Sequence, residues 1–267
     1  MDVAEREARA AQAEQLVQTL AERDVGMVAT TFVDNAGITR VKSVPLSRLP
    51  QLAAWGVGAS TSFDYFRFDD WLAAPEGGTA PVGDLRVIPD LRRVVPLAAQ
   101  PGWAWTPGDR YRQDGEPHER CNRLALQRLV EDAAADGLEI KAAIEIEWVV
   151  SAGDGDDFVS AAVGPAYGMT RLINVSDYVR DVIAALSAEG IAVEQFHPEY
   201  AAGQLEIVRC GGVSRRRRRH RLCWYAAPSA PSAGATTTAP RSHPRWTPRA
   251  SGTAVMCISA CGGTARI

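Results

Sequence analysis

The sequence predicts an α+β protein, because stretches with apolar residues at helical spacing alternate with short β-branched stretches bounded by Gly, Pro and Asn. The chain has 267 residues, enough for one large domain or two small ones with a hydrophobic core. Hydrophobic residues make up 46% and charged residues 23% of the chain. No apolar run approaches the ~18 residues that a membrane helix needs. This composition is typical of a water-soluble globular protein and excludes a membrane-spanning one.

The N-terminal part predicts a helix followed by a small mixed sheet. Residues 2–24 place Ala, Leu and Val at helical spacing among Glu, Arg and Gln. Residues 27–32 and 38–44 are predicted as the strands of a hairpin, with Asn and Gly in the 33–37 turn. A helix is expected at residues 46–55, and short strands separated by Gly and Pro should follow up to residue 95.

The next part predicts helices that alternate with strands. Gly137 and Gly190 follow two helical patterns and are expected to end those helices. The predicted elements, in chain order, are a strand at 103–106, a helix at 122–137, a strand at 140–150, a helix at 176–190, and strands at 191–196 and 204–208. We therefore expect a layered α+β domain in this part of the chain.

The charge of the chain changes abruptly near residue 209. Residues 209–267 contain eleven Arg and no Lys, Asp or Glu, so they carry +11. Since the whole chain carries −3, residues 1–208 carry −14. Four of the five cysteines also lie after this point, which argues against a disulfide framework. The N-terminus has no apolar stretch typical of a secretory signal, so we expect a cytoplasmic protein with reduced thiols.

Two groups of carboxylates have spacings that suit a metal ion. Glu145 and Glu147 are two residues apart in a predicted apolar strand, so both point to one face. Burying two like charges is costly unless a cation compensates, although a strand with one wetted acidic face would also explain them. The second group contains Glu194, Glu199 and Glu206, around two strands joined by a Gly turn.

Hard divalent cations take oxygen ligands, and several convergent carboxylates could hold more than one ion beside the phosphates of a nucleotide. His197 lies within the second group but, taken alone, is more typical of a core or surface histidine than of a ligand. The sequence contains neither a Walker-type nor a GxGxxG phosphate loop, so ordinary P-loop and Rossmann folds find no support.

Five segments in the same order resemble the glutamine synthetase family, in its type-I-like bacterial branch. The most specific is Phe196-His-Pro-Glu-Tyr-Ala-Ala-Gly-Gln-Leu-Glu206. The others are Phe32-Val-Asp-Asn-Ala-Gly37 with Val41-Lys-Ser-Val-Pro45, Gly83-Asp-Leu-Arg-Val-Ile-Pro-Asp90, Ala143-Ile-Glu-Ile-Glu-Trp148 and Gly164-Pro-Ala-Tyr-Gly168. Together they cover roughly residues 25–208.

The resemblance implies a domain order. Residues 1–24 would be an N-terminal helix, 25–107 a β-grasp-like domain, and 108–208 the N-terminal part of an incomplete catalytic α/β domain. It also implies ATP-dependent ligation of ammonia or another amine to the γ-carboxyl of L-glutamate, through γ-glutamyl phosphate. Mg²⁺ or Mn²⁺ would be the cofactor, ATP the co-substrate, and the assembly a ring-shaped homo-oligomer without a membrane partner.

The resemblance also assigns site residues. The divalent-metal ligands would be Glu145, Glu147, Glu199 and Glu206, and Glu194 would lie beside the nucleotide. The family's ammonium loop corresponds only loosely to Phe63-Asp-Tyr-Phe-Arg-Phe-Asp69, in which Asp64 would bind ammonium. Since this loop departs from the family pattern, a γ-glutamyl-polyamine or other amine ligase is the alternative function.

Residues 209–267 do not continue the family pattern, and we interpret them as out-of-frame translation that forms a disordered tail. Back-translating residues 222–232 with GC-rich codons and reading from the third base gives LLVRRTIRAV, which resembles the family's next helix. The same displacement turns residues 250–259 into VGNGGHVHL, a segment that carries a metal-ligand histidine in the family. Without it, we expect this truncated chain to be inactive or nearly so alone.

Two other interpretations of the tail remain open. A non-catalytic protein could bind nucleic acid through the basic tail, but the Arg run lacks interleaved aromatic residues, and we do not expect nucleic acid as a partner. A zinc site formed by Cys257, Cys261, His220 and His243 matches no regular spacing. A further alternative concerns the whole chain, which could be a catalytically dead subunit that assembles with an intact paralogue.

The frameshift hypothesis predicts the gene sequence around codon 208. Sequencing the locus should show an inserted or deleted base near this point, downstream of which the displaced frame continues the family pattern. A reading frame that runs intact through codon 208 would contradict the hypothesis and leave the basic tail as evolved sequence.

Overall fold

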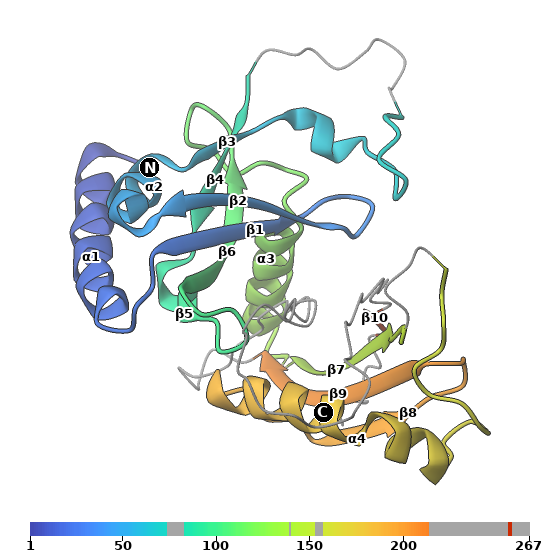
Figure 1. Cartoon of the computed structure of the whole chain (residues 1–267). Coiled ribbons are helices and arrows are strands. Elements are labelled where there is room, and N and C mark those ends of the chain that lie inside the picture. The colour runs from blue at the N-terminus through green and yellow to red at the C-terminus, as the bar shows by residue number, and fades with distance from the viewer. Residues whose placement is uncertain (74–82, 139, 153–156, 214–255, 258–267) are drawn as a thin grey trace. The chain divides into compact units, whose positions relative to one another are not determined.

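The computed structural model describes residues 1–73, 83–138, 140–152, 157–213 and 256–257. The chain forms two compact units, Met1–Leu138 and Glu139–Ile267. Each unit has its own sheet and its own helices (Figure 1). Among the helices of the described residues, none is long and apolar enough to cross a membrane.

The first unit is built on a mixed six-stranded sheet. The sheet has the order β2-β1-β6-β4-β3, with β5 paired to β6. Strands β1 and β6 are parallel, and all the other pairs are antiparallel. Its strands are β1 (Met27–Val33), β2 (Thr39–Pro45), β3 (Val57–Ala59), β4 (Leu85–Pro89), β5 (Val95–Pro96) and β6 (Trp103–Tyr111). Its α-helices are α1 (Val3–Ala21), α2 (Leu49–Trp55) and α3 (Asn122–Ala135), and short 3₁₀ helices cover Leu46–Arg48, Thr61–Asp64 and Leu91–Arg93.

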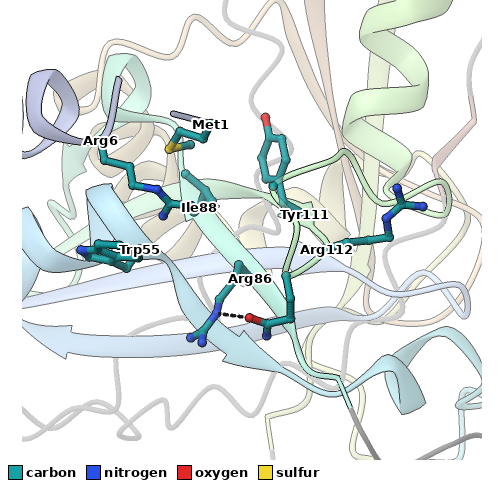
Figure 2. A pocket seen from close by; sticks show the side chains of 9 residues that line it. Met1, Arg6, Trp55, Arg86, Ile88, Tyr111 and Arg112 are labelled. Carbon is teal, nitrogen blue, oxygen red and sulfur yellow. Dashed lines mark hydrogen bonds between the residues drawn. The ribbon is translucent and has the colours of Figure 1, made fainter. Parts of the chain in front are cut away.

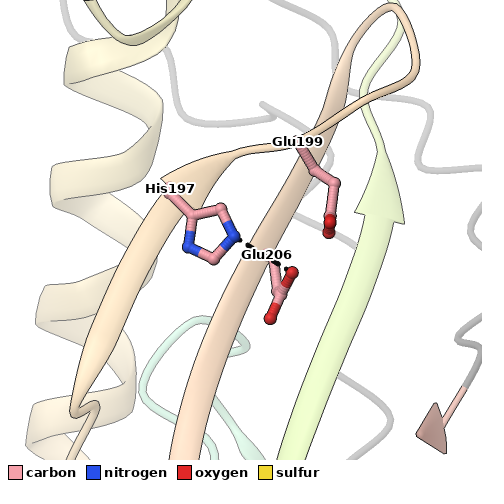
Figure 3. Close-up of side chains that lie close together, drawn as sticks. All are labelled: His197, Glu199 and Glu206. Atoms are coloured by element: carbon pink, nitrogen blue, oxygen red, sulfur yellow. Dashed lines mark ion pairs between the residues drawn. The ribbon is translucent and has the colours of Figure 1, made fainter. Parts of the chain in front are cut away.

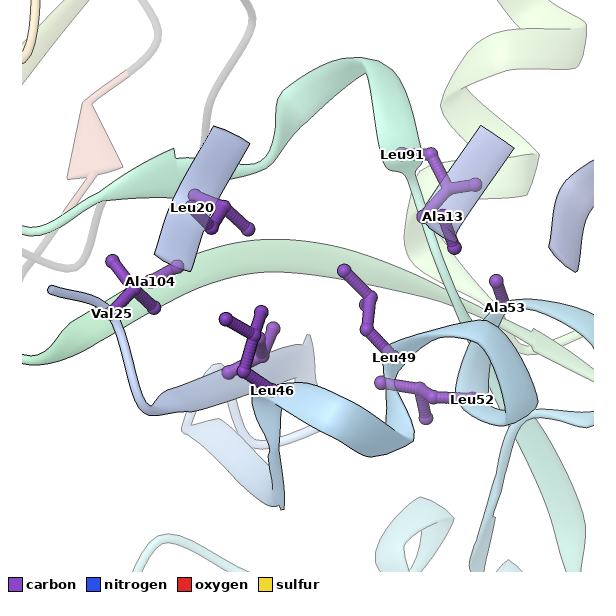
Figure 4. Close-up of a cluster of buried hydrophobic side chains, with 10 residues drawn as sticks. Ala13, Leu20, Val25, Leu46, Leu49, Leu52, Ala53, Leu91 and Ala104 are labelled. Atoms are coloured by element: carbon purple, nitrogen blue, oxygen red, sulfur yellow. The ribbon is translucent and has the colours of Figure 1, made fainter. Parts of the chain in front are cut away.

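Helices α1 and α2 enclose the main apolar core of this unit with the sheet (Figure 4). Leu20 of α1 and Leu49 and Leu52 of α2 are almost fully buried there. Two arginines of α1 fasten the helices together, since Arg6 and Arg9 donate to the carbonyls of Ala54 and Ala53 at the end of α2. These carbonyls have no partner within their own helix, and cations are favourable at a helix C-terminus.

The second unit contains an antiparallel sheet and one long helix. The sheet has the order β10-β7-β9-β8. Its elements are β7 (Ile140–Val149), α4 (Met169–Ala188), β8 (Gln195–Pro198), β9 (Gln204–Val213) and β10 (Met256–Cys257). Val175, Val179 and Leu186 of α4 pack in one buried cluster with Trp148 of β7 and Leu205 of β9. The helix therefore covers the apolar face of the sheet and leaves the other face for polar side chains.

The structure corrects three of the predicted elements. Strand β6 extends to Tyr111 instead of ending at Thr106, because it lies inside the sheet and pairs with β1, β4 and β5. Helix α4 begins at Met169 instead of Ser176. Residues 191–194 are not a strand, although Ile191 is buried in the core, and β8 begins only at Gln195.

Two other expectations stay predictions. The structural units divide after Leu138, whereas the family domains are expected to divide near residue 108, within β6. The β-grasp-like assignment of residues 25–107 rests on the resemblance. Of the expected disordered tail, residues 209–213 continue β9 and residues 256–257 form β10, both paired with β7. The rest of the tail lies outside the described residues, as do the histidines and Cys261 of the alternative zinc site.

Candidate metal centre

The polar face of the second sheet carries the predicted carboxylates. Along β7, Ile146 and Trp148 contribute to the helix-covered core, so Glu145 and Glu147 point to the opposite face. The ladder pairs Glu147 with Glu206 of β9, and it pairs Glu206 with His197 of β8. Three strands thus place these side chains side by side on one face of the sheet.

His197, Glu199 and Glu206 are close enough to share a metal ion (Figure 3). One ligand atom from each residue lies within 4.8 Å of the other two. The His197 Nε2 atom is 3.1 Å from Oε2 of Glu206, and Gln195 contacts the other ring nitrogen at 3.2 Å. Both carboxylates are buried, whereas the imidazole is half-buried.

Only one of the two carboxylate oxygens of Glu199 has a hydrogen-bond partner among the described residues. The Tyr167 hydroxyl donates to its Oε1 atom at 2.9 Å, and the Tyr167 ring stacks on His197 with a centroid distance of 4.9 Å. Its other oxygen, Oε2, is buried and has no hydrogen-bond partner within the described part of the chain. A buried carboxylate oxygen without a donor is costly, so this atom is suited to accept a cation.

A buried arginine fixes the turn that carries Glu199. Arg171 of α4 donates to the backbone carbonyls of Glu199 and Ala201, and its Nε donates to Gly164. Gly203 closes the turn with φ +73°, and a Cβ at this position would lie 2.7 Å from the Val150 carbonyl oxygen. The turn therefore requires glycine between the two carboxylates.

Burial and the neighbouring carboxylates raise the pKa of Glu206. Burial, followed by the close approach of Glu199 and the charges of Glu199, Glu145 and Glu147, raises the pKa of Glu206 to about 8. Without a cation, this carboxyl therefore stays protonated at neutral pH. A divalent ion would replace the proton, which couples metal binding to pH.

The donor set fits a hard divalent cation. Carboxylate oxygens suit Mg²⁺ and Mn²⁺, and an imidazole nitrogen is accepted more readily by Mn²⁺. The Glu199 oxygen without a partner and the raised pKa of Glu206 both show that the described side chains do not stabilise full ionisation of this cluster. The centre can thus hold a cation and, through it, the oxygens of a phosphate group.

Of the other predicted site residues in this unit, Glu147 and Glu145 lie beside the cluster, whereas Glu194 is exposed and precedes β8. Glu147 lies opposite Glu206 and accepts a hydrogen bond from the Gln204 amide at 2.6 Å. Glu145 lies two residues away on the same face and contributes charge to the cluster. Glu194 is exposed and immediately precedes β8, and its backbone N–H bonds to Val208. The metal and nucleotide roles assigned to these residues stay predictions.

Asp64 lies in the first unit, where it forms a buried charge network. Its Oδ1 atom accepts from Arg110 at 2.5 Å, and its Oδ2 atom is 2.6 Å from His118 Nε2. The side chains of Asp64 and Arg110 are 2% and 1% exposed, so solvent hardly screens the pair. Because both carboxylate oxygens are occupied, an ammonium ligand would have to share them. The ammonium role of Asp64 stays a prediction.

Several supporting residues were not identified from the sequence. His197 was interpreted as a core or surface histidine, yet it lies close enough to Glu199 and Glu206 to share a metal ion with them. Tyr167 lies in the Gly164-Pro-Ala-Tyr-Gly168 segment that carried the resemblance, but no role was assigned to it. No local sequence pattern identifies Arg110 and His118 as partners of Asp64, because Asp64 lies about fifty residues away from both in the chain.

Comparisons with known proteins give a family model and several relatives. A family model described as the glutamine synthetase catalytic domain matches residues 119–210. A gamma-glutamylpolyamine synthetase of Streptomyces coelicolor is 54% identical over 183 residues, which cover 67% of this chain and 39% of that protein. A glutamine synthetase of Rhizobium leguminosarum bv. phaseoli is 26% identical over 189 residues, which cover 70% of this chain and 41% of the relative.

Two further matches extend the comparison. A glutamate-methylamine ligase of Methyloversatilis universalis is 27% identical, with 71% of this chain and 42% of the relative covered. The crystal structure of a glutamine synthase homologue has a TM-score of 0.59 and 28% identity, with 70% of this chain and 44% of that chain covered. The chain thus spans about two fifths of the length of the curated relatives that it matches.

Replacing Asp64 should destabilise the protein strongly. In Asp64→Asn, the buried Arg110 guanidinium loses its counter-charge, so the free energy of unfolding should fall by about 3–5 kcal/mol. Urea unfolding followed by tryptophan fluorescence measures this change. The matched control, Arg67→Met, removes the exposed Arg67–Asp69 pair and should cost less than about 1 kcal/mol. Equal effects of the two variants would show that the Asp64 network is not structural.

The stability of the metal-free protein should fall as the pH rises from about 4.5 to 8. Glu206 has a raised pKa in the folded state, so in this window the folded state binds more protons than the unfolded state. One proton of difference changes the free energy of unfolding by at most about 1.4 kcal/mol per pH unit. Thermal unfolding across this range, with and without Glu206→Gln, measures the slope. An unchanged slope in the variant would rule out Glu206 as its source.

Proposed function

The chain belongs to the glutamine synthetase family, and from this premise we propose that it carries the metal- and phosphate-binding part of an ATP-dependent ligase. The reaction joins an amine to the γ-carboxyl of L-glutamate through γ-glutamyl phosphate. The observation that carries the proposal is the cluster of the half-buried His197 with the buried Glu199 and Glu206, with Glu147 paired to Glu206 across the ladder. Crowded carboxylates of this kind serve a reaction in which negative charge develops on phosphate oxygens.

The described side chains divide into ligands and supports. Glu147, Glu199 and Glu206 supply oxygens for Mg²⁺ or Mn²⁺, and Glu145 adds charge and a further ligand on the same face. A bound divalent ion would neutralise charge on the ATP phosphates. His197 orients Glu206 through its 3.1 Å contact, while Tyr167 and Arg171 hold the side chain and the backbone of Glu199. These supports keep the carboxylates together in spite of their repulsion.

We propose a polyamine or another organic amine, in preference to ammonia, as the second substrate. The 54% identical relative is a gamma-glutamylpolyamine synthetase, whereas the glutamine synthetase and the methylamine ligase are 26% and 27% identical. The Asp64 segment departs from the family's ammonium loop, and both oxygens of Asp64 bind other side chains. Ammonia remains the alternative, because the carboxylate centre itself is common to either reaction.

The backbone pairing of β10 bears on the interpretation of the tail. Met256 and Cys257 pair with Ile146 and Glu145 of β7. With the GC-rich codons used above, the displaced frame reads His-Val-His over codons 255–258, which include the codons of these two residues. The chain as written has Met and Cys at the paired positions, where the displaced frame would supply histidine, which supports the expectation that this chain turns over slowly or not at all.

The proposal is tested first on metal binding, which uses only side chains in the chain as written. Mn²⁺ titration of the full-length protein, followed by electron paramagnetic resonance, should show saturable binding. Glu206→Gln and Glu147→Gln should each weaken it by about tenfold or more, because each removes a charged ligand. Asp181→Asn, an exposed carboxylate on α4, is the matched control and should bind Mn²⁺ as the unmodified chain does. Equal affinity in all four proteins would contradict the proposed centre.

The second readout is ADP release with ATP, glutamate and one of putrescine, spermidine, methylamine or ammonia. We expect the protein as written to release little ADP, and any turnover to be fastest with a polyamine and lost in Glu206→Gln. Turnover that is independent of glutamate and amine would contradict the ligase assignment. Faster turnover with ammonia than with any organic amine would overturn the substrate preference.

A further inference from the structure

A cavity in the first unit is lined by arginines and aromatic rings. Its volume is about 140 Å³. The residues that line it are Met1, Arg6, Trp55, Arg86, Ile88, Tyr111, Arg112, Gln113 and Gly115. None of them is acidic, and none belongs to the carboxylate cluster of the second unit. Figure 2 shows Arg6 and Trp55 on one side of the cavity and Tyr111 and Arg112 on the other.

Two of these guanidinium groups are held in place by neutral partners. The Arg6 Nη1 atom donates to the Ala54 carbonyl at 2.9 Å, and its guanidinium lies 4.2 Å from the centroid of the Trp55 ring. The Arg86 Nε atom donates to the Gln113 side chain at 3.3 Å. Such contacts orient a guanidinium without neutralising its charge, which leaves its remaining N–H groups free to bind an anion.

The charge balance of the cavity is therefore positive. Arg112 has its own carboxylate, since its Nη2 atom is 3.3 Å from Asp114. Arg6 and Arg86 have no carboxylate within ion-pair distance among the residues that the structure describes. Two oriented and uncompensated cations in one small cavity match the charge of a dianion.

The remaining walls limit the size and shape of the ligand. Ile88 is 5% exposed and supplies an apolar surface, and the half-buried Tyr111 ring stands beside it. We propose that this cavity binds a small dianion, either a short dicarboxylate or a phosphate group, whose oxygens contact Arg6 and Arg86. The proposal does not rest on the proposed ligase reaction, because no residue that lines the cavity is assigned a role in that reaction.

The experiment is calorimetric titration of the full-length protein at constant ionic strength, with succinate, inorganic phosphate or acetate. Succinate or phosphate should bind saturably, and acetate, with one charge, about tenfold more weakly. The better of the two dianions identifies the chemical source. Arg86→Gln and Arg6→Gln should each weaken that binding about tenfold or more, because each removes a charge-assisted hydrogen bond.

Two controls separate the site from general surface charge and from loss of folding. Arg48→Gln removes one exposed positive charge outside the cavity, and it should bind the dianion as the unmodified chain does. Arg86→Lys keeps the charge and should keep part of the affinity, and thermal unfolding checks that each variant is folded. Equal losses in Arg48→Gln and Arg86→Gln, or no saturable binding of either dianion, would overturn the proposal. Loss of binding in Glu206→Gln would also overturn it, because the two sites would then not be independent.

Discussion

The candidate metal centre depends on the register of β7 against β9, which holds Glu147 and Glu206 opposite each other although like charges across a ladder repel. The register is held by the opposite face, where Trp148 and Leu205 pack under α4. A slip of one residue would turn the carboxylates into the core and these apolar side chains outward. Hydrophobic burial on one face of the sheet therefore holds the carboxylates close together on the other face in spite of their repulsion. A bound cation would reduce this repulsion.

The two units bury carboxylates in opposite ways. Asp64 is buried together with Arg110 and His118, so its charge is compensated within the protein and the network stabilises the folded state. In the second unit, Glu199 keeps one oxygen without a partner in the described residues, and the pKa of Glu206 is raised by its neighbours. Charge that the fold leaves uncompensated is charge available to a ligand. In the first unit, Arg6 and Arg86 likewise have no carboxylate partner among the described residues, whereas Arg110 is paired with Asp64.

Most of the fold could be predicted where the local signal was strong. Helix α1, the β1–β2 hairpin, α3 and β7 follow from apolar spacing and from turn residues within each segment. The errors lie where pairing overrides local preference. Strand β6 continues through Pro107 and Gly108 because it has neighbours on both sides, and residues 191–194 lack a ladder although Ile191 is buried. Such pairing partners are distant in the chain, so local patterns could not reveal them.

For the candidate site, the sequence alone indicated which carboxylates to consider as ligands and determined that Glu145 and Glu147 share a face, because alternation along a strand is a local property. It also indicated that a glycine turn brings Glu199 near Glu206. Only the tertiary structure decided that His197 joins them, that Tyr167 and Arg171 support Glu199, and that Asp64 is bound to Arg110. The physical reason is that ligation and charge compensation depend on distances of a few ångströms between strands and loops, which only chain folding establishes.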